Sequence, residues 1–391
     1  MSTDLVAPGS PPRVPLSTLL HDWGRIGCTG FGGPPSHIAL LRELCVQKRG
    51  WLTEEDFEDA IAACNMLPGP ASTQLAIYCA WRLRGRPGAV VGGLAFIVPG
   101  LILIIGLAAL FLSSSPPRVV LGLGAGAGAA VAAVALRAGW SLVPASWKRA
   151  EAGSQARWVV YLAAGAAAAA TLGPWLVLIL LACGGIELAL QHNLFSSRAA
   201  TFAPVPLLAI SASASGGLLA LAWVAFKVGA LSYGGGFVII PLIQADVVSH
   251  YHWMTGGQFL NAVALGQITP GPVVLTVAVV GYAAAGVGGA LLATLIAFTP
   301  SFAFITLGGQ RFDLIRRDQR ARSFLDGAGP AAIGAILGSA IPLARALQQD
   351  WQYAVLAAAV ALLFVLRRGV VLTLLLAGVA GGIIALAGGP L

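Results

Sequence analysis

Two copies of the tripeptide Pro-Gly-Pro interrupt apolar segments of the chain, at residues 68–70 and 270–272. Two prolines around a glycine remove backbone donors and end a helix, so a new half-helix must start after each copy. The N-terminus of a helix exposes unpaired N–H groups and the positive end of a dipole, which suits an anion. The pattern therefore predicts anion binding where the half-helices begin, at Ala71-Ser72-Thr73 and at Val273-Val274.

Polar residues stand at matched positions around the two copies. Asn65 and Gln267 each precede a Pro-Gly-Pro by three residues and could orient the anion. Arg25 and Lys227 also match, within or at the edge of apolar stretches, where a charge is costly and marks a functional candidate. Two such cations would suit a dianion. The alternative for Arg25 is a side chain that snorkels from the membrane face.

A glycine motif predicts a second break in each half, at Phe31-Gly32-Gly33-Pro34 and at Tyr233-Gly234-Gly235-Gly236. Its backbone could approach a ligand, and close helix packing is an equally good explanation. The predicted substrate-binding residues are Arg25, Lys227, Gly32, Gly33, Asn65, Pro68, Gly69, Pro70, Ser72, Thr73, Gly234, Gly235, Gln267, Pro270, Gly271 and Pro272.

These motifs belong to an internal repeat. Residues 24–80 align without a gap on residues 226–282, and the shared residues are mostly Gly, Pro and Trp. Composition alone could align alanines, but hardly two Pro-Gly-Pro triplets and two tryptophans in one register. Matching helix breaks in two hydrophobic halves are typical of transporters that bind their substrate between the halves.

The composition is that of an integral membrane protein. The mean hydropathy is +0.85, 58% of the residues are hydrophobic and 10% are charged, against about 25% charged in soluble domains. We expect a polar N-terminal tail at 1–16, a first repeat at 17–191, a linker at 192–205 and a second repeat at 206–391. Residues 118–138 are one expected span, 206–243 are another apolar segment, and no secretory signal peptide is evident.

Basic residues in the loops predict the topology. The loops on both sides of 57–81 are basic, whereas their counterparts 244–258 and 283–289 contain no Lys or Arg. The bias reverses further on, because 310–322 holds five arginines and the matching loop near 113–118 holds one. The positive-inside rule then predicts an inverted repeat. We expect an all-α polytopic membrane protein with broken or re-entrant helices at Pro-Gly-Pro; the alternative is a spanning helix kinked at proline.

Several function classes lack their signatures. The sequence has no nucleotide-binding loop of Walker type, no metal-type cysteine spacing and no free basic stretch for nucleic acid. We therefore expect no cofactor, no metal and no enzyme. The alternative from another class is an intramembrane redox enzyme, for which Cys28, Cys64 and Cys79 would be the plausible redox groups.

The motifs as a set resemble the chromate ion transporter family in its long, two-domain form. The resemblance is carried by the run 31–38, by Asn65-Met66-Leu67-Pro68-Gly69-Pro70, and by Gly266-Gln267-Ile268-Thr269-Pro270-Gly271-Pro272. Two residues depart from the family pattern, because Gln74 and Asn261 stand where it has acidic residues. Both departures remove candidate proton carriers.

The resemblance implies a multi-pass protein of the cytoplasmic (inner) membrane that exports chromate and gives chromate resistance. We expect alternating access driven by an ion gradient, with the proton as one candidate coupling ion and a homodimer as one candidate assembly. A sulfate or molybdate transporter, in either direction, stays an alternative, because these tetrahedral oxyanions would suit the same helix termini and cations.

Overall fold

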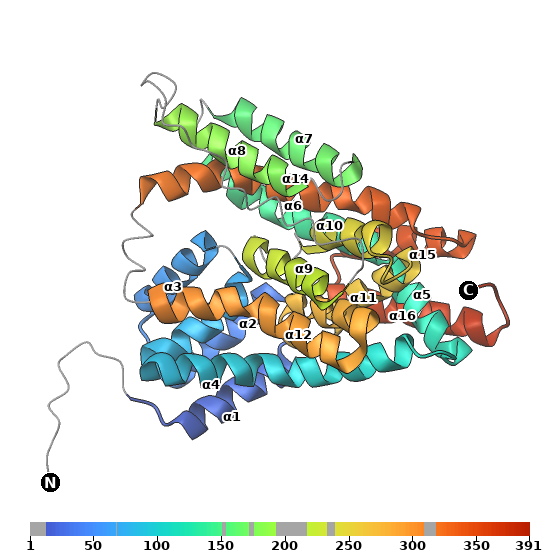
Figure 1. Cartoon of the computed structure of the whole chain (residues 1–391), viewed down its shortest axis with the longest axis horizontal. Helices are drawn as coiled ribbons and strands as arrows, with labels where there is room; N and C mark the ends of the chain where they lie inside the picture. Colours follow the sequence, from blue (N-terminus) through green and yellow to red (C-terminus); the bar gives the residue numbers. More distant parts are fainter. Residues whose placement is uncertain are drawn as a thin grey trace, which may run out of the picture.

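The computed structural model describes residues 13–67, 69–150, 154–171, 176–192, 217–232, 239–308 and 318–391. Within these ranges every regular element is a helix and there is no strand. Helices α7, α8 and α14 form one layer, and α1 and α4 lie on the opposite side, with α9, α11 and α12 between them (Figure 1).

The helices of the first half are α1 Leu16–Thr29, α2 Pro34–Arg42, η1 Glu43–Lys48, α3 Glu54–Met66, α4 Ala71–Phe111, α5 Arg118–Ala129, α6 Val131–Arg149, α7 Gln155–Thr171 and α8 Leu176–Gln191. Those of the second half are α9 Leu218–Leu231, α10 Ile239–Gln244, η3 Ala245–His250, α11 Gly256–Ile268, η4 Val273–Leu275, α12 Thr276–Gly308, α14 Gln319–Arg345, α15 Asp350–Val360, η6 Ala361–Val365 and α16 Val370–Leu386.

Helix bounds follow the sequence repeat. Helices α1 and α9 both have 14 residues, and α3 and α11 both have 13. The hydroxyls of Thr53 and Thr255 cap α3 and α11, each accepting a hydrogen bond from the amide three residues later. The local signals that start the helices are therefore duplicated along with the breaks.

Helix α4 is two helices that fold back on each other. Its backbone is non-helical at Arg84 and Gly85, where the glycine has a φ of 63°. A Cβ on Gly92 would lie 2.4 Å from the Ala80 Cβ, and one on Gly93 would lie 2.9 Å from Ile77 Cγ1. Residues on opposite sides of Gly85 therefore face each other, and the half-helix 71–83 runs antiparallel to 86–111.

Helix α12 is broken in the same way. Its backbone is non-helical at Ala285 and Gly286, and the glycine has a φ of 60°. A Cβ on Gly281 would lie 2.3 Å from the carbonyl oxygen of Gly289, so the two parts pack backbone against backbone. The segment 283–289, which the charge pattern predicts to be a loop, is a tight glycine turn.

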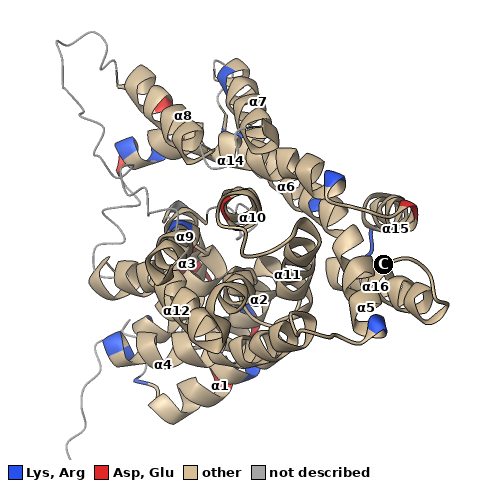
Figure 2. Ribbon diagram, turned by 45° about the vertical axis from the view of Figure 1, so that its right-hand side comes forward, with Lys and Arg blue, Asp and Glu red and all other residues tan. Residues whose placement is uncertain are grey.

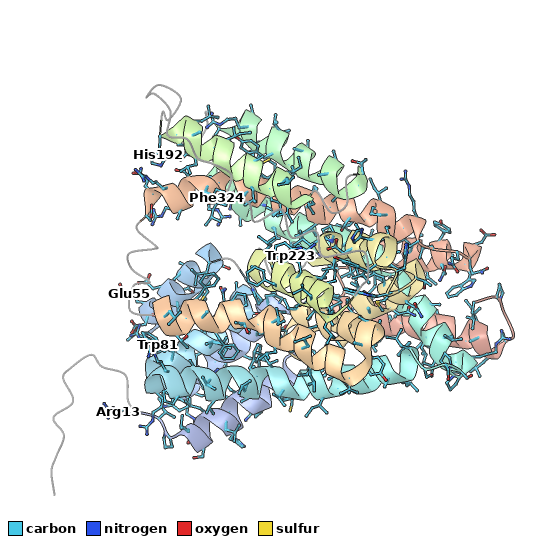
Figure 3. All side chains as sticks on the ribbon, in the orientation of Figure 1. Arg13, Glu55, Trp81, His192, Trp223 and Phe324 are labelled. Carbon is cyan, nitrogen blue, oxygen red and sulfur yellow. The ribbon has the colours of Figure 1, made fainter. Side chains whose placement is uncertain are left out.

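An ion pair shows how α3 and the half-helix 71–83 are arranged. Arg82 Nη2 lies 3.3 Å from Asp56 Oδ1, which joins the end of the half-helix to the start of α3. Glu55 and Trp81, their sequence neighbours, lie at the same edge of the molecule (Figure 3). Both helices therefore begin and end at one side, and the Pro-Gly-Pro break lies at the far end of this hairpin.

The two halves interlock through their later helices. Helix α14 of the second half packs on α6, α7 and α8, and α16 packs on α5. Small residues allow these close approaches, as is usual in membrane bundles. Charged residues are few along the ribbon and lie mostly near helix ends (Figure 2). The protein is a multi-pass membrane protein: the described segments 71–111, 118–149, 273–308 and 319–345 are long and apolar enough to span.

Two expected segments differ from the described helices. The span expected at 118–138 continues as α5 and α6 to Arg149, because Arg137 does not end the helix. The apolar segment expected at 206–243 contains two helices in the structure: α9 ends at Leu231 and α10 begins at Ile239. Residues 206–216 and 233–238 lie outside the described residues.

Candidate functional site

The first Pro-Gly-Pro break separates α3 from α4 as the sequence predicts. Helix α3 ends at Met66, Gly69 has a φ of +123°, and helix begins again at Ala71. The amides of Thr73 and Gln74 donate to the carbonyl oxygen of Pro70. The earlier amides of a first turn have no partner within their own helix. Pro68 lies outside the described residues.

The second break repeats this backbone geometry. Helix α11 is followed by Gly271, with a φ of +93°, and Pro272 precedes the short helix η4. The amide of Gly271 donates to the carbonyl oxygen of Gly30, 3.1 Å away, at the end of α1. This break is therefore tied directly to the first half of the chain.

A chain of hydrogen bonds connects the two breaks. His37 Nδ1 lies 3.2 Å from Ser72 Oγ, in the first turn of α4, and Nε2 lies 3.0 Å from the Gly30 carbonyl oxygen. That carbonyl also accepts the Gly271 amide. Because a carbonyl can only accept, Nε2 carries the proton, and a neutral imidazole then accepts at Nδ1 from the Ser72 hydroxyl.

His37 was missed by sequence reasoning as a site residue. It is fully buried in α2 and packs edge-on against Phe96, with ring centroids 5.0 Å apart. The available signal was a histidine within an apolar segment, four residues after Gly33. Its role depends on two elements distant in sequence, and local patterns do not show that.

The glycine motif of the first half lies beside the second break. Gly32 and Gly33 have φ values of +97° and +75°, and Gly33 caps α2. A Cβ on Gly33 would lie 3.5 Å from Val273 Cγ2. This motif therefore joins α1 to α2 next to the opposite half. Gly234 and Gly235 lie outside the described residues.

Several buried polar atoms have no hydrogen-bond partner among the described residues. They are Thr73 Oγ1, Ser232 Oγ, Ser301 Oγ and Gln267 Nε2. The two aligned residues before the breaks differ, because Gln267 is buried and Asn65 is exposed. Leaving a buried polar atom unpaired costs about 1–3 kcal/mol, so each such atom requires an explanation.

The two predicted cations each lie beside a carboxylate of their own half. Lys227 Nζ forms an ion pair with Asp246 Oδ2, and its side chain is 13% exposed. Arg25 is exposed and lies near Glu43. A hydrogen bond from Lys48 lowers the pKa of Glu43, and the charge of Arg25 adds to that effect. The structure therefore does not present Lys227 as a free charge.

Removing the Lys227 ammonium should lower the stability of the protein, whether or not Lys227 contacts the substrate. The variant Lys227→Ala leaves the buried Asp246 carboxylate without this partner, which costs about 3–5 kcal/mol for buried pairs. The double variant Lys227→Met/Asp246→Leu should recover most of that loss, as measured by thermal unfolding in detergent. Normal oxyanion transport by the stable double variant would contradict a substrate role for Lys227.

A separate polar cavity of about 420 Å³ lies between α6, α7, α8 and α14. Glu187 is 2% exposed there and accepts two hydrogen bonds from Arg157 and one from Tyr161. Its charge is thus fully paired within the bundle. The cavity is lined by none of the residues at the two breaks, and within the described residues no cluster of His, Cys, Asp and Glu could hold a metal.

Comparison with known proteins covers both halves of the chain. A family model described as "Chromate transporter" matches residues 17–187 and 219–383. A "Chromate transport protein" of Cupriavidus metallidurans is 31% identical over 367 residues, 90% of each chain. A "Chromate transport protein" of Pseudomonas aeruginosa is 29% identical over 411 residues, which cover 98% of this chain and 96% of the relative. No solved structure matches.

Proposed function

This chain belongs to the chromate transporter family, and from that premise we propose that it is a secondary transporter that exports chromate by alternating access across the cytoplasmic membrane. The observation that carries the proposal is the seating of each Pro-Gly-Pro break against the opposite half. Gly271 donates to Gly30, and a Cβ on Gly69 would lie 3.3 Å from the Gly229 carbonyl oxygen. Movement of one half against the other would then change both breaks together.

We further propose that the halves are an inverted repeat, with a tail at 1–16, repeats at 17–191 and 206–391, and a linker at 192–205. The matched family segments 17–187 and 219–383 support this division. The opposite charge bias of matching loops supports the inversion. The equal lengths of α1 and α9, and of α3 and α11, fit one architecture used twice.

In this scheme the segment 54–83 is a re-entrant hairpin. Helix α3 has 13 residues and is about 20 Å long, which is too short for a hydrocarbon core of about 30 Å. The Asp56–Arg82 pair holds the outer ends of the hairpin together. The basic residues Arg84 and Arg86 then favour the cytoplasmic side.

Cysteine labelling tests the hairpin. In a background with Cys28→Ala, which removes the exposed cysteine, the variants Glu55→Cys and Arg84→Cys should both react with an impermeant maleimide in everted vesicles. Neither should react in intact spheroplasts. Labelling of the two positions from opposite sides would show that the segment crosses the membrane instead.

The substrate site proposed from the sequence lies around the two breaks. The first-turn amides that follow them would bind the oxyanion, with Arg25 and Lys227 attracting it and Asn65 and Gln267 orienting it. The burial of the residues 69–74 and 270–276 supports a site closed from water. Water exclusion strengthens every hydrogen bond to an anion, because the local dielectric is low.

Uptake of chromate into everted vesicles that contain the protein tests the function. Accumulation that an ionophore abolishes, and that sulfate reduces only in excess, is the expected result. No accumulation above control vesicles, with the protein inserted, would contradict chromate export and direct attention to sulfate and molybdate. A variant with all five cysteines replaced by alanine should still transport, whereas a redox enzyme that uses Cys64 or Cys79 would be inactive.

A further inference from the structure

The first break contains hydroxyl groups that are buried and unpartnered. Thr73 Oγ1 and Ser301 Oγ have no hydrogen-bond partner among the described residues, and both residues are 0% exposed. Thr73 lies in the first turn of the half-helix 71–83, whereas Ser301 comes from α12 of the opposite half. Buried hydroxyls of this kind indicate a missing partner, since buried polar groups are usually bonded.

Polar side chains from both halves approach Gly69, two residues before the half-helix 71–83 begins. A Cβ on Gly69 would lie 3.2 Å from Ser301 Oγ and 2.5 Å from Gln74 Nε2. Hydroxyl and amide donors therefore approach the break from both halves of the protein. Together with the amides of Ala71 and Ser72, which have no partner within their own helix, they form a set of neutral donors suited to the oxygens of an anion.

The second break lacks the hydroxyls that Ser72, Thr73 and Ser301 supply at the first break. The repeat places Leu275 at the position of Thr73 and Val274 at that of Ser72. Counted from the turn glycines Gly85 and Gly286, Pro99-Gly100 corresponds to Pro300-Ser301, so a glycine replaces the Ser301 hydroxyl. That glycine is in contact with the break, because a Cβ on it would lie 2.3 Å from the Pro270 carbonyl oxygen. The Gly271 amide is already bonded to Gly30.

We propose that the oxyanion binds at the first break alone, to Thr73, Ser301 and the first-turn amides of 71–83, and that the second break is a structural joint. This inference rests on the proposed transport function and narrows the proposed site from two breaks to the first, so that Gly271 and the amides after it no longer belong to the binding site. The repeat would have kept its backbone at both breaks, while the hydroxyls of Ser72, Thr73 and Ser301 are found at the first break alone. Because Ser301 belongs to α12, movement of the second half would change its contact with the bound oxyanion directly.

A matched pair of glycine variants tests the asymmetry. Gly69→Ala and Gly271→Ala both place a side chain at positive φ, so both carry backbone strain. The new methyl at 69 would enter the donor cluster, whereas at 271 its nearest neighbour would lie 3.6 Å away, an ordinary contact. Gly69→Ala should abolish chromate binding, and Gly271→Ala should retain it within a few fold. Equal losses would overturn the proposal.

Hydroxyl variants avoid the strain. Thr73→Val and Ser301→Ala should each weaken chromate binding by about 10-fold or more, the usual effect of losing a hydrogen bond to a charged group. The controls are Thr294→Val and Ser339→Ala, whose buried hydroxyls donate to carbonyl oxygens of their own helices. These controls should bind as the wild type does. Unchanged affinity in both hydroxyl variants would overturn the assignment.

Equilibrium dialysis of labelled chromate against purified protein measures binding apart from transport. Normal wild-type transport with unaltered binding in Thr73→Val and Ser301→Ala would overturn this inference and leave the proposed function intact. Absence of both binding and transport in the wild type would overturn the two together. Size-exclusion profiles identify any variant that has not folded, and the isosteric Thr73→Val keeps the test valid if Gly69→Ala fails that check.

Discussion

Replacing Gly334 by alanine should leave little folded protein. Gly334 lies in α14 where this helix meets α7, and a Cβ there would lie 1.9 Å from the carbonyl oxygen of Leu162. A backbone atom cannot rotate away, so the two helices would have to separate. Gly338 makes the same kind of contact with Ala166, and Gly165 with Ala331, so the whole interface would loosen. Overpacking usually costs about 1–3 kcal/mol, and a backbone clash this close should reach at least about 3 kcal/mol.

The matched control for Gly334 is Gly106→Ala in α4. A Cβ on Gly106 would have no atom within 4 Å, so alanine should leave stability unchanged or raise it by about 0.5–1 kcal/mol through helix propensity. Thermal unfolding in detergent and the yield of monodisperse protein measure both variants. Equal unfolding temperatures for Gly334→Ala and the wild type would contradict the packing described for α7 and α14.

Much of the fold could be predicted because a small number of local sequence features determine where membrane helices lie and where they end. The apolar composition and the Pro-Gly-Pro breaks act locally, and the structure confirms the two breaks, with helices that end at Met66 and Ile268 just before them. Loops were expected after 57–81 and at 283–289, and the structure has tight turns there, at Gly85 and Gly286. How closely the helices pack on either side of each turn was not predicted, because that depends on contacts across the turn.

The candidate site was harder to predict than the fold. The repeat suggested two equal breaks, and residues aligned by it were treated as equal partners. The structure places different side chains against each break, because the partners come from the opposite half. The bonds of His37 and the position of Ser301 depend on that crossing. A single sequence contains no local signal for such contacts.

Replacing His37 by alanine should abolish transport and destabilise the protein. The change removes a fully buried ring, leaves Ser72 Oγ without this partner and deletes a bond to the Gly30 carbonyl oxygen. Loss of a buried ring and of its hydrogen bonds should cost about 3–5 kcal/mol. Vesicle uptake and thermal unfolding measure the two effects.

Two conservative variants separate a linking role of His37 from simple packing. Glutamine can reach the Gly30 carbonyl oxygen as Nε2 does, whereas asparagine can reach Ser72 as Nδ1 does. Each of these variants keeps one of the two bonds and loses the other. If the hydrogen-bond chain from Ser72 to Gly271 couples the breaks, transport should fall in both variants even where stability recovers. Transport that follows stability alone, with His37→Gln or His37→Asn fully active once folded, would show that the ring only fills space.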